Sequence, residues 1–230
     1  MRSRLFKSLA AGAVAALLVA GLGTEAGAGP SVSPKALHKG RARVFVKPSA
    51  NKVLYDQNDN PSGVAIISQN FEGELDVYDA RAADDFTVPE GKRWTVKEVD
   101  VTGFYFNGIG PAASENVVFY QSSSGHPGAP IHKYSRIVGV DNGTGSFVID
   151  LGRGVKLGEG HYWVSVQVNM RFDCCGEWGW ETRIAEHRKP AVWENPGDGF
   201  GTGCTTYKFM RKCFPGEGPD LMFALRGKKQ

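Results

Sequence analysis

The sequence predicts an all-β domain, a two-sheet antiparallel β-sandwich of the jelly-roll kind with about ten strands and little helix. The apolar segments are short, rich in β-branched and aromatic residues, and bounded by Gly, Pro, Asn or Asp, which is typical of strands. Turn signals recur at intervals of roughly a dozen residues, as in sandwiches and barrels. No stretch of that length has the 3.6-residue apolar period of a capped helix.

In chain order, the segments that fit a strand pattern are 52–57, 63–68, 82–88, 94–106, 116–121, 131–140, 146–151, 162–169, 178–184, 191–194 and 220–225. Within 94–106, Trp94 and Val96 share one face of the strand, whereas Val99 and Val101 share the other. This change of phase predicts a β-bulge or a bend between the two pairs. Residues 141–145, with the sequence DNGTG, predict a hairpin turn because Asn and Gly tolerate a positive φ.

The first 28 residues have the three zones of a cleavable secretory signal peptide. Arg2, Arg4 and Lys7 precede an apolar run, and small residues up to Ala28 provide a cleavage site. The apolar run is shorter than the roughly 20 residues that a membrane-spanning helix needs. We therefore expect cleavage near Ala28, a secreted protein, and no transmembrane segment after cleavage. The alternative is an uncleaved N-terminal anchor.

The remainder of the chain is predicted to contain one domain. We expect a flexible basic arm at 29–49, the β-sandwich domain at 50–227 and a basic tail at 228–230. Residues 50–225 contain 16 basic and 23 acidic residues, a net charge of −7. A nucleic-acid partner is therefore not expected, because such proteins carry a basic patch on the folded surface. The basic ends are either solvated or in contact with anionic wall polymers or lipid headgroups.

Four cysteines, Cys174, Cys175, Cys204 and Cys213, lie in the last third of the chain. In an exported protein disulfides are the expected state, and adjacent cysteines do not have the spacing of a zinc site. Three connectivities are open. Cys204 and Cys213 enclose a short loop that allows a local bridge, which leaves Cys174 and Cys175 as a vicinal disulfide or as free thiols. The crossed pairings would instead tie the two loops together.

Two aromatic side chains suggest a ligand surface. Trp178 and Trp180 lie on one face of a predicted strand with only a glycine between them. Planar aromatic rings flanked by hydrogen-bonding side chains are typical of sugar-binding surfaces. The predicted ligand-binding residues are Trp178, Trp180, Glu181, Arg183 and Tyr207. The alternative is that the two indoles belong to the core.

Acidic residues suggest a second kind of site. Asp84 and Asp85 are neighbours on a predicted strand, so their side chains point to opposite faces and cannot share a proton. The functional interpretation is a structural Ca²⁺ site, because Ca²⁺ binds several carboxylate and carbonyl oxygens. Asp84 or Asp85 would form this site together with Asp56 near the first strand or Asp220 near the last. The alternative is that one Asp hydrogen-bonds a buried turn while the other is solvated, and no cofactor is then required.

Several motifs follow one another in a fixed order: LYDQ at 54–57, AADDFTVP at 82–89, YWVSV at 162–166, WGWE at 178–181, WENPGDGFGTGC at 193–204 and PDLMF at 219–223. In this the chain resembles a β-sandwich module of bacterial secreted and surface proteins, over nearly all of residues 52–227. The resemblance implies a local bridge between Cys204 and Cys213, and it implies no catalytic residues. The adjacent pair Cys174 and Cys175 departs from the pattern of the module.

No HExxH, CxxC or GxSxG motif occurs in the sequence, so a non-catalytic protein is expected. The first hypothesis is a secreted domain that binds an extracellular glycan, another cell-surface polymer or a surface partner, with a polysaccharide as the favoured ligand. The second hypothesis is a purely structural extracellular module, and the third is an unrecognised secreted hydrolase. The sequence leaves the identity of the ligand and the oligomeric state open.

Overall fold

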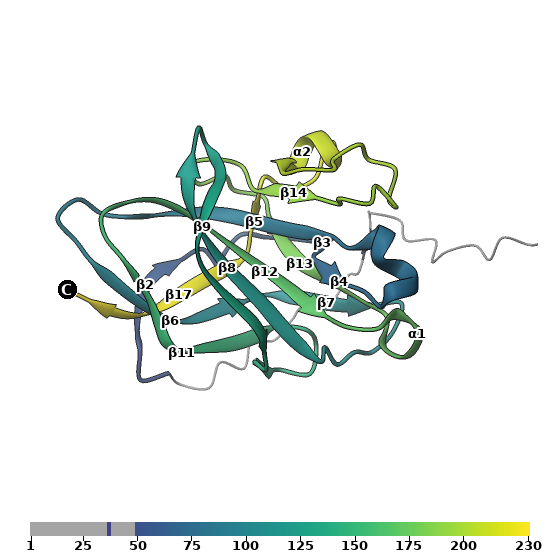
Figure 1. The fold of residues 1–230 in the computed structure, drawn as a ribbon, viewed down its shortest axis with the longest axis horizontal. Helices are drawn as coiled ribbons and strands as arrows, with labels where there is room; N and C mark the ends of the chain where they lie inside the picture. The colour runs from purple at the N-terminus through teal and green to yellow at the C-terminus, as the bar shows by residue number, and fades with distance from the viewer. Residues whose placement is uncertain (1–35, 38–48) are drawn as a thin grey trace, which may run out of the picture. The chain divides into compact units, whose positions relative to one another are not determined.

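The computed structural model describes residues 36–37 and 49–230, and the fold of these residues is all-β and sandwich-like, as predicted (Figure 1). The predicted signal peptide, its cleavage site and most of the predicted arm lie outside the described residues. Within the predicted arm, Ala36 and Leu37 form a two-residue strand that pairs with 64–65. No helix among the described residues is long and apolar enough to cross a membrane.

The strands form three sheets. The first contains β1 (Ala36–Leu37), β3 (Pro61–Ile67), β13 (Glu177–Arg183) and β16 (Asp220–Leu221) in this order, with β7 (Gly103–Phe106) paired to β13. The second has the order β10 (Val140–Asp141), β11 (Phe147–Leu157), β6 (Trp94–Val101), β17 (Phe223–Lys229), β2 (Lys52–Asp56). The third has the order β15 (Lys208–Phe209), β14 (Val192–Glu194), β5 (Arg81–Val88), β12 (Gly160–Asn169), β8 (Ser114–Ser123), β9 (His126–Ile137), with β4 (Gln69–Asn70) paired to β12.

The first two sheets are continuous with each other. Strand β6 passes into β7 after the single residue Thr102, and β16 passes into β17 after Met222. The described residues thus form 17 strands in three sheets, rather than about ten strands in two. Helix is confined to three short pieces: the 3₁₀ helix η1 (Gly73–Tyr78), α1 (Phe172–Cys175) and α2 (Met210–Cys213).

The predicted bulge in segment 94–106 is confirmed. Between its pairs Val96–Gly227 and Glu98–Arg226, β6 advances two residues while β17 advances one, so Lys97 is the extra residue of a bulge against β17. Against β11 the register shifts at the same place, with residues 151–154 of β11 left unpaired. The bulge lets Trp94 and Val96 on one side of it, and Val99 on the other, all lie in the core. The predicted hairpin at 141–145 is also present, because β10 pairs antiparallel with β11 across this turn.

The third sheet has apolar residues on both of its faces. One face contributes to the main core, which draws on all three sheets, with Trp180 from the first, Val99 from the second and Val166 from the third. The opposite face, which we call the outer face, carries a smaller buried cluster of Ala83, Tyr120, Trp163 and Val192, against which Tyr207 and Phe209 pack. Polar side chains on this sheet are therefore placed either inside the sandwich or on the outer face.

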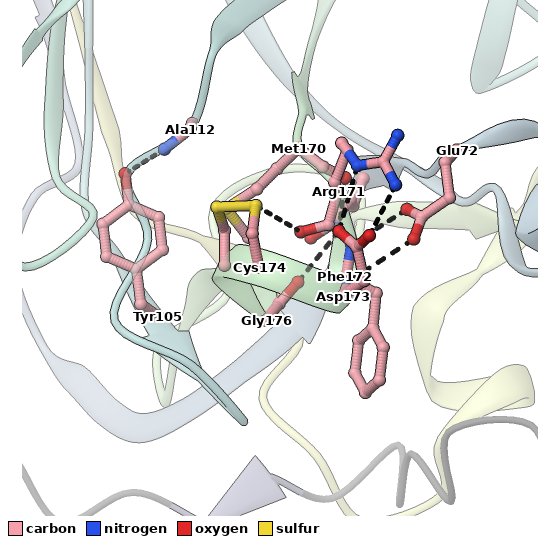
Figure 2. The surroundings of a disulfide bond; sticks show 11 residues. Glu72, Tyr105, Ala112, Met170, Arg171, Phe172, Asp173, Cys174 and Gly176 are labelled. Carbon is pink, nitrogen blue, oxygen red and sulfur yellow. Dashed lines mark hydrogen bonds and ion pairs between the residues drawn. A yellow bond between two sulfur atoms is a disulfide. The ribbon is translucent and has the colours of Figure 1, made fainter.

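Both cysteine pairs are disulfides. Cys204 and Cys213 form the local bridge that the resemblance implies, with Cα atoms 6.0 Å apart, a usual separation for a disulfide. Cys174 and Cys175 form a vicinal disulfide in α1 (Figure 2). The Cys175 carbonyl accepts a hydrogen bond from Gly110 N at 2.9 Å, which ties α1 to the loop after β7.

We expect the Cys204→Ser/Cys213→Ser variant to lose about 2–3 kcal/mol of unfolding free energy, because the bridge closes a loop in the unfolded chain. The matched Cys174→Ser/Cys175→Ser variant should lose much less, because a bond between adjacent residues closes almost no loop. Urea unfolding of both variants beside the parent protein measures the two losses. A larger loss in the vicinal variant would contradict this assignment of roles.

Candidate functional site

The two indoles of the predicted sugar-binding surface are core residues. Trp178 and Trp180 are fully buried, and their ring centroids lie 6.5 Å apart. Trp178 Nε1 donates to the Gly145 carbonyl at 2.6 Å, and Trp180 Nε1 donates to the Met222 carbonyl at 2.7 Å. All seven residues of β13 are buried, so this strand has no solvent-facing side. A stacking surface made of these indoles is therefore absent, and the alternative interpretation as core residues holds.

The other three residues of the predicted binding set do not complete a site with them. Glu181 and Arg183 lie on the same strand and are also buried. Arg183 Nη2 forms an ion pair with Asp59 Oδ1, and its Nη1 lies 3.6 Å from Asp220 Oδ2, so its charge is balanced by carboxyl groups of the protein. Tyr207 lies apart from β13, on the outer face of the third sheet, where its ring centroid is 6.1 Å from that of Tyr120.

Three of the four predicted calcium ligands are buried close to one another. Asp84, Asp85 and Asp220 are fully buried, whereas Asp56 is exposed on β2. Among the described residues, no group of three or more His, Cys, Asp or Glu side chains is arranged to hold a metal ion. The carboxyl groups instead have protein donors as their partners, so their arrangement gives the predicted calcium site no support.

Asp84 connects the three sheets. Its Oδ2 accepts hydrogen bonds from Leu221 N at 2.8 Å and from Gln57 Nε2 at 2.7 Å, and its Oδ1 accepts one from Asp85 N at 2.8 Å. Leu221 belongs to the first sheet, Gln57 follows β2 of the second, and Asp84 itself lies in β5 of the third. Burial, followed by the nearby charge of Asp220, raises the pKa of Asp84 well above its usual range.

Asp85 and Asp220 attach the loop 184–190 to the domain. Asp220 Oδ2 accepts a hydrogen bond from His187 N at 2.5 Å, and Asp85 Oδ2 accepts one from Lys189 N at 3.3 Å. Asp85 also pairs with the His161 ring on the neighbouring strand β12. Burial raises the pKa of Asp220 to about 7, although the His187 N–H and Arg183 oppose this shift. Asp84 and Asp85 are both buried, so neither is the solvated Asp of the alternative interpretation.

A cleft of about 430 Å³ opens beside this loop, between β2, the turn that joins β5 to β6, and the end of β17. We call it the Tyr55 cleft. Its lining residues are Leu54, Tyr55, Thr87, Pro89, Lys92, Trp94, His187, Arg188 and Lys229.

Tyr55 joins the cleft to the buried acids beneath it. Its hydroxyl donates to Gln57 Oε1 and lies 2.8 Å from His187 Nδ1, while Gln57 in turn donates to Asp84. The Tyr55 ring lies 5.4 Å from that of Phe223, centroid to centroid, on the core side. Burial and then the charge of Asp84 raise the pKa of Tyr55 above its ordinary value, so its hydroxyl stays neutral and remains a hydrogen-bond donor.

The charged groups of the Tyr55 cleft are cationic. Lys92, Arg188 and Lys229 line it, and no Asp or Glu does so among the described residues. Thr87 Oγ1 and Trp94 Nε1, from two further lining residues, are buried and have no hydrogen-bond partner in the part of the chain that the structure describes. Lysine and arginine side chains can only donate hydrogen bonds. The cleft therefore presents mainly donors without matching acceptors.

Sequence reasoning did not single out this cleft, because its residues come from four distant segments. Lys229 is placed beside Trp94 by the ladder between β17 and β6, although the two are 135 positions apart in the sequence. Arg188 and His187 are placed by backbone hydrogen bonds of their loop to buried carboxyls. The one signal for this cleft in the sequence is the basic C-terminus. Contact with an anionic wall polymer is one of the interpretations that its charge allows.

No family model matches this chain, and no curated protein matches it.

Proposed function

We propose that this chain is a secreted, non-catalytic binding module that attaches to an acidic extracellular polysaccharide through the Tyr55 cleft. The observation that carries the proposal is the cleft itself, in which three cationic side chains surround aromatic and apolar walls. The resemblance to a β-sandwich module of secreted and surface proteins agrees with this role, as does the expected signal peptide.

The charge of the cleft supports an anionic ligand. Residues 50–225 carry a net charge of −7, and yet Lys92, Arg188 and Lys229 meet at one cleft without an acidic neighbour in its lining. A carboxylate or sulfate group accepts hydrogen bonds and donates none, so it matches a lining that mainly donates.

The walls of the cleft favour a sugar chain as the molecule that bears the anionic groups. Tyr55 and Pro89 provide rigid apolar surface, on which the carbon–hydrogen face of a sugar ring can pack. An acidic polysaccharide provides both the ring faces and the anionic groups that this lining fits.

The test removes the three cations together. In the Lys92→Ser/Arg188→Ser/Lys229→Ser variant we expect affinity for polygalacturonate and heparin to fall at least tenfold, about 1.4 kcal/mol. Binding by the parent protein should weaken as salt is added, because the cationic groups are at the surface. Affinity electrophoresis or calorimetry with each acidic polymer, and with dextran as the neutral reference, measures both effects.

The matched control is Arg153→Ser/Lys156→Ser/Lys212→Ser, which removes the same charge from exposed positions outside the cleft. It should bind nearly as well as the parent protein. Equal losses of affinity in the two variants would show that binding depends only on the overall charge of the protein, and would contradict a binding site at the cleft. If the parent protein binds neither acidic polymer, the proposal fails and the purely structural module becomes the better hypothesis.

A further inference from the structure

A second hollow lies on the outer face of the third sheet, over β5, β12, β8 and β9, which run side by side (Figure 1). It has a volume of about 180 Å³ and shares no lining residue with the Tyr55 cleft. We call it the outer-face groove. Its polar lining includes Arg81, Asn116, Tyr120, Lys133, Ser165 and Gln167.

The amide side chains of the groove are held in fixed orientations. Asn116 Nδ2 donates to Asn169 Oδ1 at 3.0 Å and to Gln167 Oε1 at 3.3 Å, while Gln167 Nε2 donates to the Ala80 carbonyl at 3.0 Å. An amide can donate two hydrogen bonds and accept two. Gln167 therefore keeps one donor and one acceptor position available, next to groups whose geometry is already set.

The charge of Arg81 is balanced inside the protein. Its Nη2 lies 2.5 Å from Glu194 Oε1, and Glu194 is buried whereas the Arg81 side chain is 41% exposed. The guanidinium has further N–H groups that can donate towards the groove. Beside it, Tyr120 and Ser165, which both carry a hydroxyl group, line the same hollow.

We propose that the outer-face groove binds an uncharged sugar ring through its hydroxyl groups. A sugar hydroxyl both donates and accepts, and so do the amides and hydroxyls of this groove, in contrast to the donor-rich Tyr55 cleft. Of the two cations in the lining, Arg81 is already neutralised by Glu194, whereas Lys133 is exposed on β9. The inference is independent of the function proposed for the Tyr55 cleft.

The burial of these side chains separates the groove from an ordinary solvated sheet face. Polar residues on such a face are usually long, exposed and free to rotate, whereas Ser165, Gln167 and Tyr120 are only 2%, 9% and 8% exposed. A binding site whose side chains are already ordered loses little conformational entropy when it takes a ligand. This preorganisation is what a small polar ligand with few contacts requires.

The experiment is a titration of the ¹⁵N-labelled mature protein with glucose, galactose, mannose and N-acetylglucosamine, followed by NMR. We expect saturable shifts with at least one sugar, confined to β5, β8, β9, β12 and the side-chain amides of Asn116 and Gln167. In Val118→Trp, which places an indole in the groove without removing a hydrogen-bonding group, the affinity should fall at least about tenfold. Gln121→Trp, at an exposed position of the same strand, is the matched control and should bind like the parent protein.

If Val118→Trp does not fold, Gln167→Leu removes the free donor and acceptor at nearly constant volume and should show the same loss. Val118→Trp should keep its affinity for polygalacturonate, and the triple variant of the Tyr55 cleft should keep its sugar shifts. The inference is overturned if none of the four sugars gives saturable shifts in these strands. It is also overturned if both groove variants bind sugar as the parent protein does.

Discussion

Replacing Asp84 by Ala is expected to lower the free energy of unfolding by about 3 kcal/mol or more. The carboxyl group of Asp84 accepts three hydrogen bonds in a site with no exposure to solvent, and Ala leaves Leu221 N, Gln57 Nε2 and Asp85 N short of an acceptor. Each buried donor left without a partner costs about 1–3 kcal/mol. Since these donors come from three sheets, the loss should affect the cooperative unfolding of the whole domain.

Asp84→Asn is an intermediate substitution. Its amide oxygen can still accept a hydrogen bond, whereas its NH₂ group faces one of the N–H donors and cannot accept from it. We expect its loss to lie between zero and that of Asp84→Ala. Asp56→Ala is the control: this acid is exposed on β2 and accepts only a local hydrogen bond from Asn58 N at 2.9 Å. Urea unfolding ranks the three variants. An Asp84→Ala loss no larger than that of Asp56→Ala would show that Asp84 does not hold the sheets together.

The fold class was predictable because strand signals are local. Alternation, β-branched residues and turn residues each act over a few positions, and even the bulge at Lys97 was visible as a change of phase between Val96 and Val99. Strands of two or three residues, such as β4 and β15, leave no such pattern. The division between the first and second sheets also went unpredicted, because breaks of one residue at Thr102 and Met222 do not look like sheet boundaries in the sequence.

The site was less predictable because it depends on long-range pairing. Trp178 and Trp180 have the spacing expected of a sugar-binding surface. Because both faces of β13 are buried, this spacing instead places the two side chains in the core. Asp84, Asp85 and Asp220 were rightly singled out as unusual acids. Their partners are backbone N–H groups of distant segments, which no composition or spacing rule reveals. The Tyr55 cleft likewise depends on how strands pair and how one loop is attached.

The domain is expected to be more stable near pH 5 than near pH 8. Four buried carboxyl groups contribute to this expectation: Glu115, Glu177, Glu181 and Asp220. Burial, the first cause in each case, raises the pKa of each of these groups to about 7. Single hydrogen bonds, such as that from Asn107 Nδ2 to Glu177 at 2.6 Å, reduce the shift without cancelling it.

The sign follows from proton binding. Between about pH 4 and pH 7 the folded protein holds protons on these groups that the unfolded chain has released, so the free energy of unfolding falls as the pH rises. The contribution is fully present below the unfolded pKa values near 4 and is lost as the pH passes about 7. In the opposite direction, Arg183 lowers the pKa of Asp59, so acidification below about pH 4 removes stability again. Stability should therefore pass through a maximum on the acidic side of neutrality.

Each unit of pKa difference corresponds to about 1.4 kcal/mol, so the four groups together should change stability by on the order of 3 kcal/mol or more. Urea unfolding at about pH 5 and about pH 8, at constant ionic strength, measures this difference. Glu177→Gln removes one titrating group while keeping an acceptor for Asn107, so the difference between the two pH values should shrink in this variant. A parent protein that gains stability from pH 5 to pH 8 would show that these carboxyls are ionised in the folded state and that their hydrogen bonds outweigh their burial.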